Sequence, residues 1–293
     1  MSSAPQPHSA TDARRELELC APITLPSALR RGAPLWLVTT QHAEYPPLLA
    51  ECEDWPPFLF VRGRLESLLA QSLSVVGTRK PSLGGRRAAA DLVTAAVAGG
   101  WAIVGGLALG IDGIAHDVAV RSGGTSIAML PCGIDRIYPQ RHAALAEQLT
   151  RRGAVVSEFP LGTPPRKHHF HRRNRTLSGF SVATLVVEAG RPSGTLLTAS
   201  AAADQGRDVL TLPWSIYHSG AAGCRYLLSD GAVLIQSAED LLSHLGVTRD
   251  TVTAAPPPDE PLFTHTAEGP SLASSATEPD QQALLTLLGA ETH

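Results

Sequence analysis

The chain has 293 residues, of which 43% are hydrophobic and 17% are charged. This length and balance suit one or two folded domains and exclude a wholly disordered protein. No apolar run reaches the ~18 residues of a membrane span, and residues 1–10 lack the pattern of a secretory signal. The four cysteines, Cys20, Cys52, Cys132 and Cys224, form no CxxC pair. We therefore expect a cytoplasmic protein without a zinc ribbon or a disulfide framework.

The net charge of −3 hides an uneven distribution. Residues 61–247 hold 19 Lys and Arg against 13 Asp and Glu, whereas residues 250–293 hold seven acids and no Lys or Arg. A basic central block favours an anionic partner. The acidic end is either a solvated tail, the plainer interpretation, or a competitor for a basic groove. The only two lysines of the chain are Lys80 and Lys167.

Residues 1–42 are of mixed character and are interpreted as an N-terminal segment that holds at most a reduced helical domain. A main domain is expected over residues 43–248. Proline-rich turns bracket the run Phe58-Leu59-Phe60-Val61, which predicts a strand that enters this domain. Short Val- and Ile-rich runs then predict strands at 73–76, 102–104, 126–130, 154–157, 183–187, 208–212 and 232–235.

Each of these runs leads through a turn into a helical pattern. The predicted helices are 86–98, 113–122, 142–152, 175–181, 195–205, 224–229 and 238–245, and glycines follow several of them where C-caps belong. Continuous apolar strands that alternate with helices indicate a parallel sheet covered on both faces. The predicted fold class is α/β, a Rossmann-like, doubly wound, mostly parallel sheet.

The C-terminal part of the chain has a different composition. Residues 249–280 are rich in Pro, Ala, Ser, Thr and acids, which is typical of a linker. Residues 281–288 then begin a new apolar helix near the end of the sequence. We interpret residues 281–293 as the truncated start of a further helical domain, or as a peptide that docks on the main fold.

Ligands of open α/β sheets bind at the carboxyl ends of the strands, and four predicted loops at that edge are unusual. The first covers residues 76–85. Gly77 permits a tight turn, Thr78 offers a hydroxyl, and Arg79 and Lys80 place two cations beside a helix N-terminus. This arrangement favours an anion site, and the plainer alternative is a solvated basic turn.

The second loop, GGLALGIDGIAH at residues 105–116, is rich in glycine, so that its backbone at Gly106 can approach a ligand closely. It does not match GxGxxG, and the dinucleotide-binding fingerprint is therefore not met. Asp112 and His116 lie four residues apart. They form either an acid/base pair or, as we favour, a capping Asp and a buried, hydrogen-bonded His.

The third segment, residues 166–175, holds five Lys and Arg, three His, one Phe and no acid. A metal site is rejected because the local field is positive and no carboxylate lies nearby in the sequence. Cations bind phosphates and an aromatic face stacks on a base, so this loop predicts contact with a nucleic acid. The plainer alternative is a surface loop that packs Phe170 into the core.

The fourth loop, residues 187–199, contains Ser193-Gly194-Thr195 at the start of a helix, which predicts a second phosphate cradle. No GK[ST] follows a glycine-rich loop, so a P-loop ATPase is excluded. A search for GxSxG and for a cysteine beside a base identifies no nucleophile. The loops together indicate a polyanion-binding site without a catalytic group.

Six ordered motifs carry a resemblance to a known family: VGTRKPS, GGLALGIDGIAH, IAMLPCGIDRIYP, RNR at 173–175, VVEAGRPSGTLLTA and GRDVLTLP. Residues 45–242 are thereby similar to the bacterial DNA-processing protein A family (DprA, also called Smf). The resemblance implies an extended Rossmann fold and a non-enzymatic, homodimeric protein without a cofactor. It also implies single-stranded DNA binding in natural transformation and recombination, with protection of incoming strands and loading of the RecA recombinase.

The resemblance also implies residue roles. It assigns a DNA-contacting pocket to Arg79, Lys167, Phe170, Arg173, Asn174 and Arg175, and a backbone cradle to Gly77, Gly106, Ser193, Gly194 and Thr195; the cationic and hydroxyl-bearing patterns add Lys80, Arg172 and Thr78. Two residues depart from the family pattern, Trp214 after Pro213 and Cys224 before the last helix, and both concern the wall of the pocket. Many relatives carry a C-terminal winged-helix domain, whose first helix would match residues 281–293.

Two other hypotheses about the function remain open at this point. Residues 190–195 also resemble the phosphate loop of Rossmann-type nucleoside-monophosphate phosphoribohydrolases, with Glu188 or Glu158 as the acid. Release of free base from nucleoside monophosphates distinguishes that enzyme from a binding protein. A pure protein-interaction scaffold would leave the cationic loops unexplained. The candidates for a dimer surface are Leu227, Leu228, Leu234 and Ile235, although core positions are the plainer interpretation.

Overall fold

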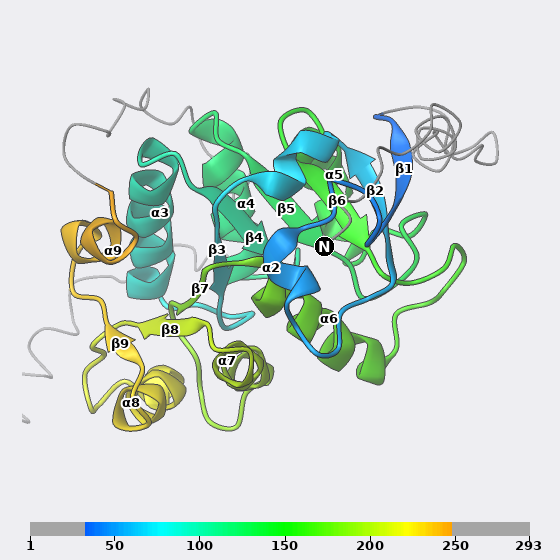
Figure 1. Cartoon of the computed structure of the whole chain (residues 1–293). Coiled ribbons are helices and arrows are strands. Elements are labelled where there is room, and N and C mark those ends of the chain that lie inside the picture. The colour runs from blue at the N-terminus through cyan, green and yellow to red at the C-terminus, as the bar shows by residue number, and fades with distance from the viewer. Residues whose placement is uncertain (1–32, 248–293) are drawn as a thin grey trace, which may run out of the picture. The chain divides into compact units, whose positions relative to one another are not determined.

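The structure is a computed structural model and describes residues 33–247 (Figure 1). Within this range one sheet has the strand order β1-β2-β6-β5-β4-β3-β7-β8-β9. In this order, the strands from β6 to β9 are all parallel to one another, whereas β2 pairs antiparallel with both β1 and β6. The strands are β1 (Leu35–Thr39), β2 (Phe58–Gly63), β3 (Ser72–Val76), β4 (Ala102–Gly105), β5 (Ser126–Met129), β6 (Ala154–Ser157), β7 (Ala183–Val186), β8 (Asp208–Thr211) and β9 (Val233–Leu234).

Helices cover both faces of the sheet, which confirms the predicted α/β, Rossmann-like, doubly wound architecture (Figure 1). Helices α3, α4 and α9 pack with one set of strand residues, and α5 completes that face, while α2, α6, α7 and α8 pack with the other set. The helices are α2 (Pro47–Ala50), α3 (Leu83–Ala98), α4 (Ile111–Arg121), α5 (Ala143–Leu149), α6 (Lys167–Phe180), α7 (Gly194–Asp204), α8 (Ala222–Ser229) and α9 (Ala238–His244).

Between residues 33 and 247, three short 3-10 turns accompany these helices: η2 (Leu65–Leu69), η3 (Gln140–His142) and η4 (Ser219–Ala221). The first strand, β1, lies in the same sheet as the main domain, so the sheet begins ahead of the expected boundary at residue 43. Most of the N-terminal segment at 1–42, the linker at 249–280 and the helical segment at 281–293 lie outside the described residues. Across residues 33–247, no helix is both long and apolar enough to cross a membrane.

Helix α6 differs from the sequence prediction, because it begins at Lys167 and not at residue 175. The cationic segment is therefore a helix and not a loop. Its inward face carries buried polar side chains, Arg173, Thr176 and Ser178, beside few apolar ones. Hydrophobic periodicity, the main helix signal in a sequence, is hidden where polar groups take the core positions.

His116 confirms the expectation of a buried, hydrogen-bonded histidine. Its side chain is fully buried, and Nδ1 lies 2.8 Å from the Ser126 hydroxyl oxygen. Burial lowers the pKa of His116 to about 3, and the charge of His142 adds to this effect. His116 does not line the cleft described below, which leaves the acid/base pair with Asp112 without support.

The low pKa of His116 predicts a loss of stability in mild acid. Below about pH 6.5 the unfolded chain binds a proton that the native imidazole does not accept, so the free energy of unfolding falls as the pH falls. We expect a loss of about 2 kcal/mol between pH 7 and pH 5 from this group. Denaturant unfolding at both pH values measures it. His116→Gln should remove most of the difference, and an equal pH dependence in the variant would contradict the assignment.

Candidate nucleic-acid interface

The strand order places a crevice at one point of the sheet. From β3 the chain winds outward to β4, β5 and β6, then returns to β7 beside β3 and continues to β8 and β9. Loops after β3 and β7 therefore diverge, and such a switch point is where open α/β sheets bind ligands. The structure has a cleft of about 1110 Å³ at this point, which is lined by the β3–α3 loop, α6 and the start of α7.

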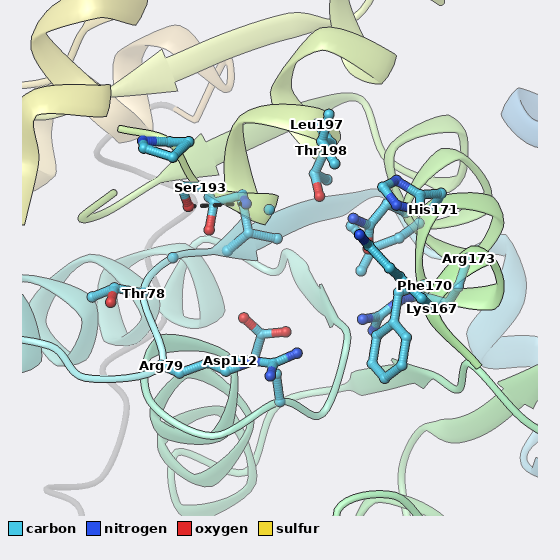
Figure 2. Close-up of a pocket in the computed structure, with 18 of the residues that line it drawn as sticks. Thr78, Arg79, Asp112, Lys167, Phe170, His171, Arg173, Ser193, Leu197 and Thr198 are labelled. Carbon is cyan, nitrogen blue, oxygen red and sulfur yellow. Dashed lines mark hydrogen bonds between the residues drawn. The ribbon is translucent and has the colours of Figure 1, made fainter. Parts of the chain in front are cut away.

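Figure 2 shows how the labelled side chains surround the cleft. One group projects from α6, a second from the start of α7, and a third from the β3–α3 loop and the first turn of α4: these are Lys167, Phe170, His171 and Arg173; Ser193, Leu197 and Thr198; and Thr78, Arg79 and Asp112. Four elements of the chain thus meet at one site. The structure brings together most of the residues that the sequence selected.

The β3–α3 loop is held tightly by its backbone. The Thr78 amide donates to the Glu188 carbonyl oxygen at 2.7 Å, and the Thr78 carbonyl oxygen accepts from the Ile111 amide at 3.2 Å. A Cβ at Gly77 would lie 2.5 Å from Ile111 Cγ1, so only glycine fits there. The turn therefore presents Arg79 and Lys80, both exposed, at a fixed place on the rim.

Phe170 lies on the cleft wall between two guanidinium groups. Its ring centroid is 5.8 Å from Arg79 Cζ and 5.9 Å from Arg173 Cζ. The ring of Tyr138 meets it edge-on, with the centroids 5.7 Å apart. The face of an electron-rich ring attracts cations, so these contacts hold the ring and the two charges in one unit.

The floor of the cleft contains a buried arginine and a buried carboxylate. Arg173 is 5% exposed, and its Nη1 donates to the Met129 carbonyl oxygen at 3.0 Å. Burial raises the pKa of Asp112, although the nearby charge of Arg173 opposes this shift. Burial likewise lowers the pKa of Arg173, and Asp112 opposes that shift. Each charge therefore limits the desolvation cost of the other.

Gly106 has a different role from the predicted phosphate cradle. Its amide donates to Asp112 Oδ2 at 2.9 Å and is directed at that carboxylate. A Cβ at Gly106 would lie 1.7 Å from Arg173 Nη1, so glycine is needed to make room for the guanidinium. Gly106 lines a smaller hollow behind Phe170 and not the main cleft. Asp112, predicted as a helix cap, instead fixes the β4–α4 loop.

The N-terminus of α7 forms the opposite wall of the cleft. Ser193, Gly194 and Thr195 all line it, as predicted. The Ser193 hydroxyl oxygen accepts from the Thr195 amide at 3.1 Å and so caps the helix. Gly194 is exposed, and nothing lies within 4 Å of a Cβ built there. The positive end of the helix dipole is therefore open to an anion in the cleft.

Two predicted DNA-contacting cations do not line the cleft. Arg172 Nε donates to Glu158 Oε2 at 2.5 Å, and Arg175 pairs with Asp54 at 3.0 Å. Their positions follow from the first part of α6, which the sequence analysis did not predict to be helical. Residues spaced three or four apart share a helix face, so Lys167 and Phe170 face the cleft together with His171 and Asn174. Arg172 and Arg175 lie on other faces, where carboxylates bind them.

Sequence reasoning missed several residues of the cleft. Tyr138 lies in the motif IAMLPCGIDRIYP and His171 lies in the cationic segment 166–175, but neither residue was predicted to line the binding site. Pro192, Leu197 and Thr198 also line the cleft. The helical spacing from Lys167 would have selected His171, but that signal requires α6 to be recognised as a helix.

The two departures from the family pattern do not form the cleft wall. Trp214 Nε1 donates to the Val187 carbonyl oxygen at 2.7 Å, and Cys224 is fully buried in α8. Neither residue lines the cleft. The expectation that these positions affect the wall of the pocket is therefore wrong, because Trp214 is bonded to the Val187 carbonyl oxygen and Cys224 is buried.

The candidate acids of the nucleotide-processing hypothesis also lie outside the cleft. Glu188 Oε2 accepts from the Ser82 amide and hydroxyl at 3.0 and 2.9 Å, and its Oε1 lies 3.0 Å from His218 Nε2. Glu158 is buried and accepts from Arg172 and Thr176. Neither carboxylate is positioned to act on a bound nucleotide.

The fold and the cleft together define a Rossmann-type α/β protein with a cleft at its switch point that is lined by cations and an aromatic ring. The family model described as DNA recombination-mediator protein A matches residues 36–246. The chain belongs to this family, whose members include proteins named DprA and Smf.

Curated relatives agree with this membership. Protein Smf of Escherichia coli is 44% identical over 210 residues, which are 71% of this chain and 56% of that protein. The DNA processing protein DprA of Bacillus subtilis is 37% identical over 203 residues, 69% of this chain and 68% of that protein. This chain matches only 56% and 54% of the Smf proteins of E. coli and Synechocystis, about half of each.

Solved structures share the fold. The X-ray structure of DprA from Streptococcus pneumoniae has a TM-score of 0.68 at 33% identity, and the alignment covers 79% of this chain and 77% of that one. A structure of DprA from Helicobacter pylori has a TM-score of 0.65 at 24% identity, with 71% of this chain and 95% of that one covered.

Proposed function

We propose that this chain binds single-stranded DNA in its cleft and acts as a recombination mediator in natural transformation. The observation that carries the proposal is the juxtaposition of the exposed cations Arg79, Lys80 and Lys167 with the ring of Phe170 in one open cleft. Cations bind the phosphates of a single strand, and an aromatic face stacks on its bases. The H. pylori relative supports the proposal, because its structure is described by its single-stranded DNA binding mode.

A salt titration tests the electrostatic part of this proposal. If the cleft neutralises about four phosphates, the logarithm of the association constant should fall against the logarithm of salt concentration with a slope near −3. The measurement uses a labelled oligonucleotide, single-stranded and duplex, at several ionic strengths. Binding of the single strand that does not depend on salt would contradict a phosphate-binding cleft.

Stacking on Phe170 predicts a second, separate effect. Phe170→Ala should weaken the binding of a single strand by about 1–3 kcal/mol and leave the salt slope unchanged, because no charge is lost. Fluorescence anisotropy of a labelled oligonucleotide measures both quantities. Phe170→Tyr, which keeps an aromatic face, is the matched control. Equal losses in the two variants would show that the ring fills space and does not stack.

The wider role that we propose includes protection of incoming strands, loading of the RecA recombinase, a cytoplasmic location and a homodimer. Membership of the family supports these parts.

Leu227 and Ile235 are buried in the core, whereas Leu234 is 42% exposed, so of these three only Leu234 can contribute appreciable surface to a dimer. Sedimentation of the protein and of Leu234→Arg tests the self-association, and RecA filament assembly on protected DNA tests the loading.

A further inference from the structure

The loop after β8 exposes apolar side chains at the edge of the sheet that holds the cleft. Ile216 is 73% exposed and Tyr217 is 91% exposed. The loop is nevertheless fixed, because Arg225 Nη1 donates to the carbonyl oxygens of Ser215 and His218 at 2.8 and 3.0 Å. An aromatic ring that a fixed loop presents to solvent offers a contact surface at little entropic cost.

Side-chain and backbone contacts connect this loop to the cleft. β8 lies parallel to β7, so the loops after both strands leave the sheet at the same edge. His218 Nε2 lies 3.0 Å from Glu188 Oε1, and the other oxygen of Glu188 accepts from Ser82, two residues after Lys80. The Trp214 ring lies 3.3 Å from a Cβ built at Gly84, at the start of α3. The loop therefore packs against the turn that carries two cleft cations.

Arg191 adds a cation to the same rim. It is exposed and directly precedes Pro192, which lines the cleft. Its Cζ lies 3.9 Å from the centroid of the Tyr226 ring on α8, and this contact holds the guanidinium in place. Tyr226 is the neighbour of Arg225, which fixes the loop. We call Arg191 and residues 214–218 together the β8 rim.

The chemistry of the β8 rim repeats that of the cleft. The rim offers an exposed aromatic ring, Tyr217, and an exposed cation, Arg191, as the cleft offers Phe170 and Arg79. The acid nearest to Arg191 in the sequence is Glu188, which is 2% exposed and bonded to Ser82 and His218. These bonds limit the competition of Glu188 with a phosphate for Arg191. A flexible polyanion that leaves the cleft past Pro192 meets this surface next.

We propose that the β8 rim is a second contact site for single-stranded DNA, which extends the binding site beyond the cleft. Tyr217 stacks on a base outside the cleft, and Arg191 binds an adjoining phosphate. This inference rests on the proposed function. The inference places the bound DNA strand along a path from Phe170, across the N-terminus of α7, to the loop after β8.

Oligonucleotides of two lengths test the inference. Strands of about 4 and about 12 nucleotides bracket the usual site sizes of single-strand-binding domains. Tyr217→Ala and Arg191→Glu should each weaken the binding of the longer strand about tenfold and change that of the shorter strand less than about twofold. Val182→Ala and Arg151→Glu are matched controls, because Val182 is 40% exposed and both residues precede strands, at the opposite edge of the sheet.

The outcomes separate the inference from the proposed function. If Arg79→Glu weakens both lengths while the rim variants change neither, the cleft binds DNA and the rim does not. Equal losses for both lengths in the rim variants also overturn the inference, since they place Tyr217 within the primary site. If Arg79→Glu changes neither length, the proposed function itself fails. Loss of self-association in Tyr217→Ala, with unchanged affinity for the longer strand, would assign the rim to a second copy of the chain.

Discussion

Reversing the charges of Arg79 and Lys167 together is expected to abolish single-strand binding. Both side chains are exposed and line the cleft, one from the β3–α3 loop and one from the start of α6. A charged hydrogen bond contributes about 1.5–3 kcal/mol, so the loss of two should cost at least about 3 kcal/mol, a factor of at least ~100 in affinity. Repulsion of the phosphates by two new carboxylates adds to that loss.

The experiment is a titration of labelled single strand against the Arg79→Glu, Lys167→Glu double variant. The matched control carries Arg87→Glu and Arg151→Glu, an equal change of net charge at exposed residues that do not line the cleft. Because neither cleft residue is buried, the melting temperature should stay close to that of the parent protein. Unchanged affinity in the cleft variant, or an equal loss in the control, would reject this cleft as the binding site.

The second large effect concerns stability. Arg173→Met should lower the free energy of unfolding by about 3 kcal/mol, because it removes a buried charged donor and the cation that most favours the ionised form of Asp112. Arg173 is 5% exposed and Asp112 is 6% exposed, so water does not replace the lost interaction readily. Denaturant unfolding at neutral pH measures the loss.

A double variant separates the charge from the packing. Arg173→Met combined with Asp112→Asn should regain about 1–2 kcal/mol, because the amide oxygen of Asn still accepts from Gly106 while the uncompensated charge is gone. Asn174→Ala, at the next position of α6, is the control and should change stability by less than about 0.5 kcal/mol. Additive losses in the double variant would show that the two charges do not interact.

Local signals explain why so much of the fold was predictable. The Val- and Ile-rich runs, and the glycines after the helices, depend on residues close in the sequence, and β6 (Ala154–Ser157) has the predicted bounds. β1 has no counterpart among the predicted strands, because it forms an antiparallel edge with β2 and stands outside the alternation of strands and helices. The start of α6 was missed because Arg173 and Thr176 occupy its buried face.

The family resemblance and the local composition selected the binding residues, and neither gives the direction in which a side chain points. Four of the five cations in residues 166–175 were predicted to contact DNA. In the structure Lys167 and Arg173 line the cleft, whereas Arg172 and Arg175 bind Glu158 and Asp54. Tyr138, which meets the Phe170 ring, reaches it only through the packing of the β5–α5 connection against α6.

The sequence by itself determined the alternation of strands and helices, the Rossmann-like class, and the two loops whose cations and hydroxyls suit an anion. These properties follow from short-range periodicity and from the chemistry of single residue types. Only the tertiary structure decided which cations meet around Phe170, that Gly106 makes room for Arg173, and that Glu188 is held by Ser82 and His218. The reason is physical: strand order and helix rotation bring together side chains a hundred residues apart, and a carboxylate from elsewhere in the chain can neutralise a cation that the sequence shows as free.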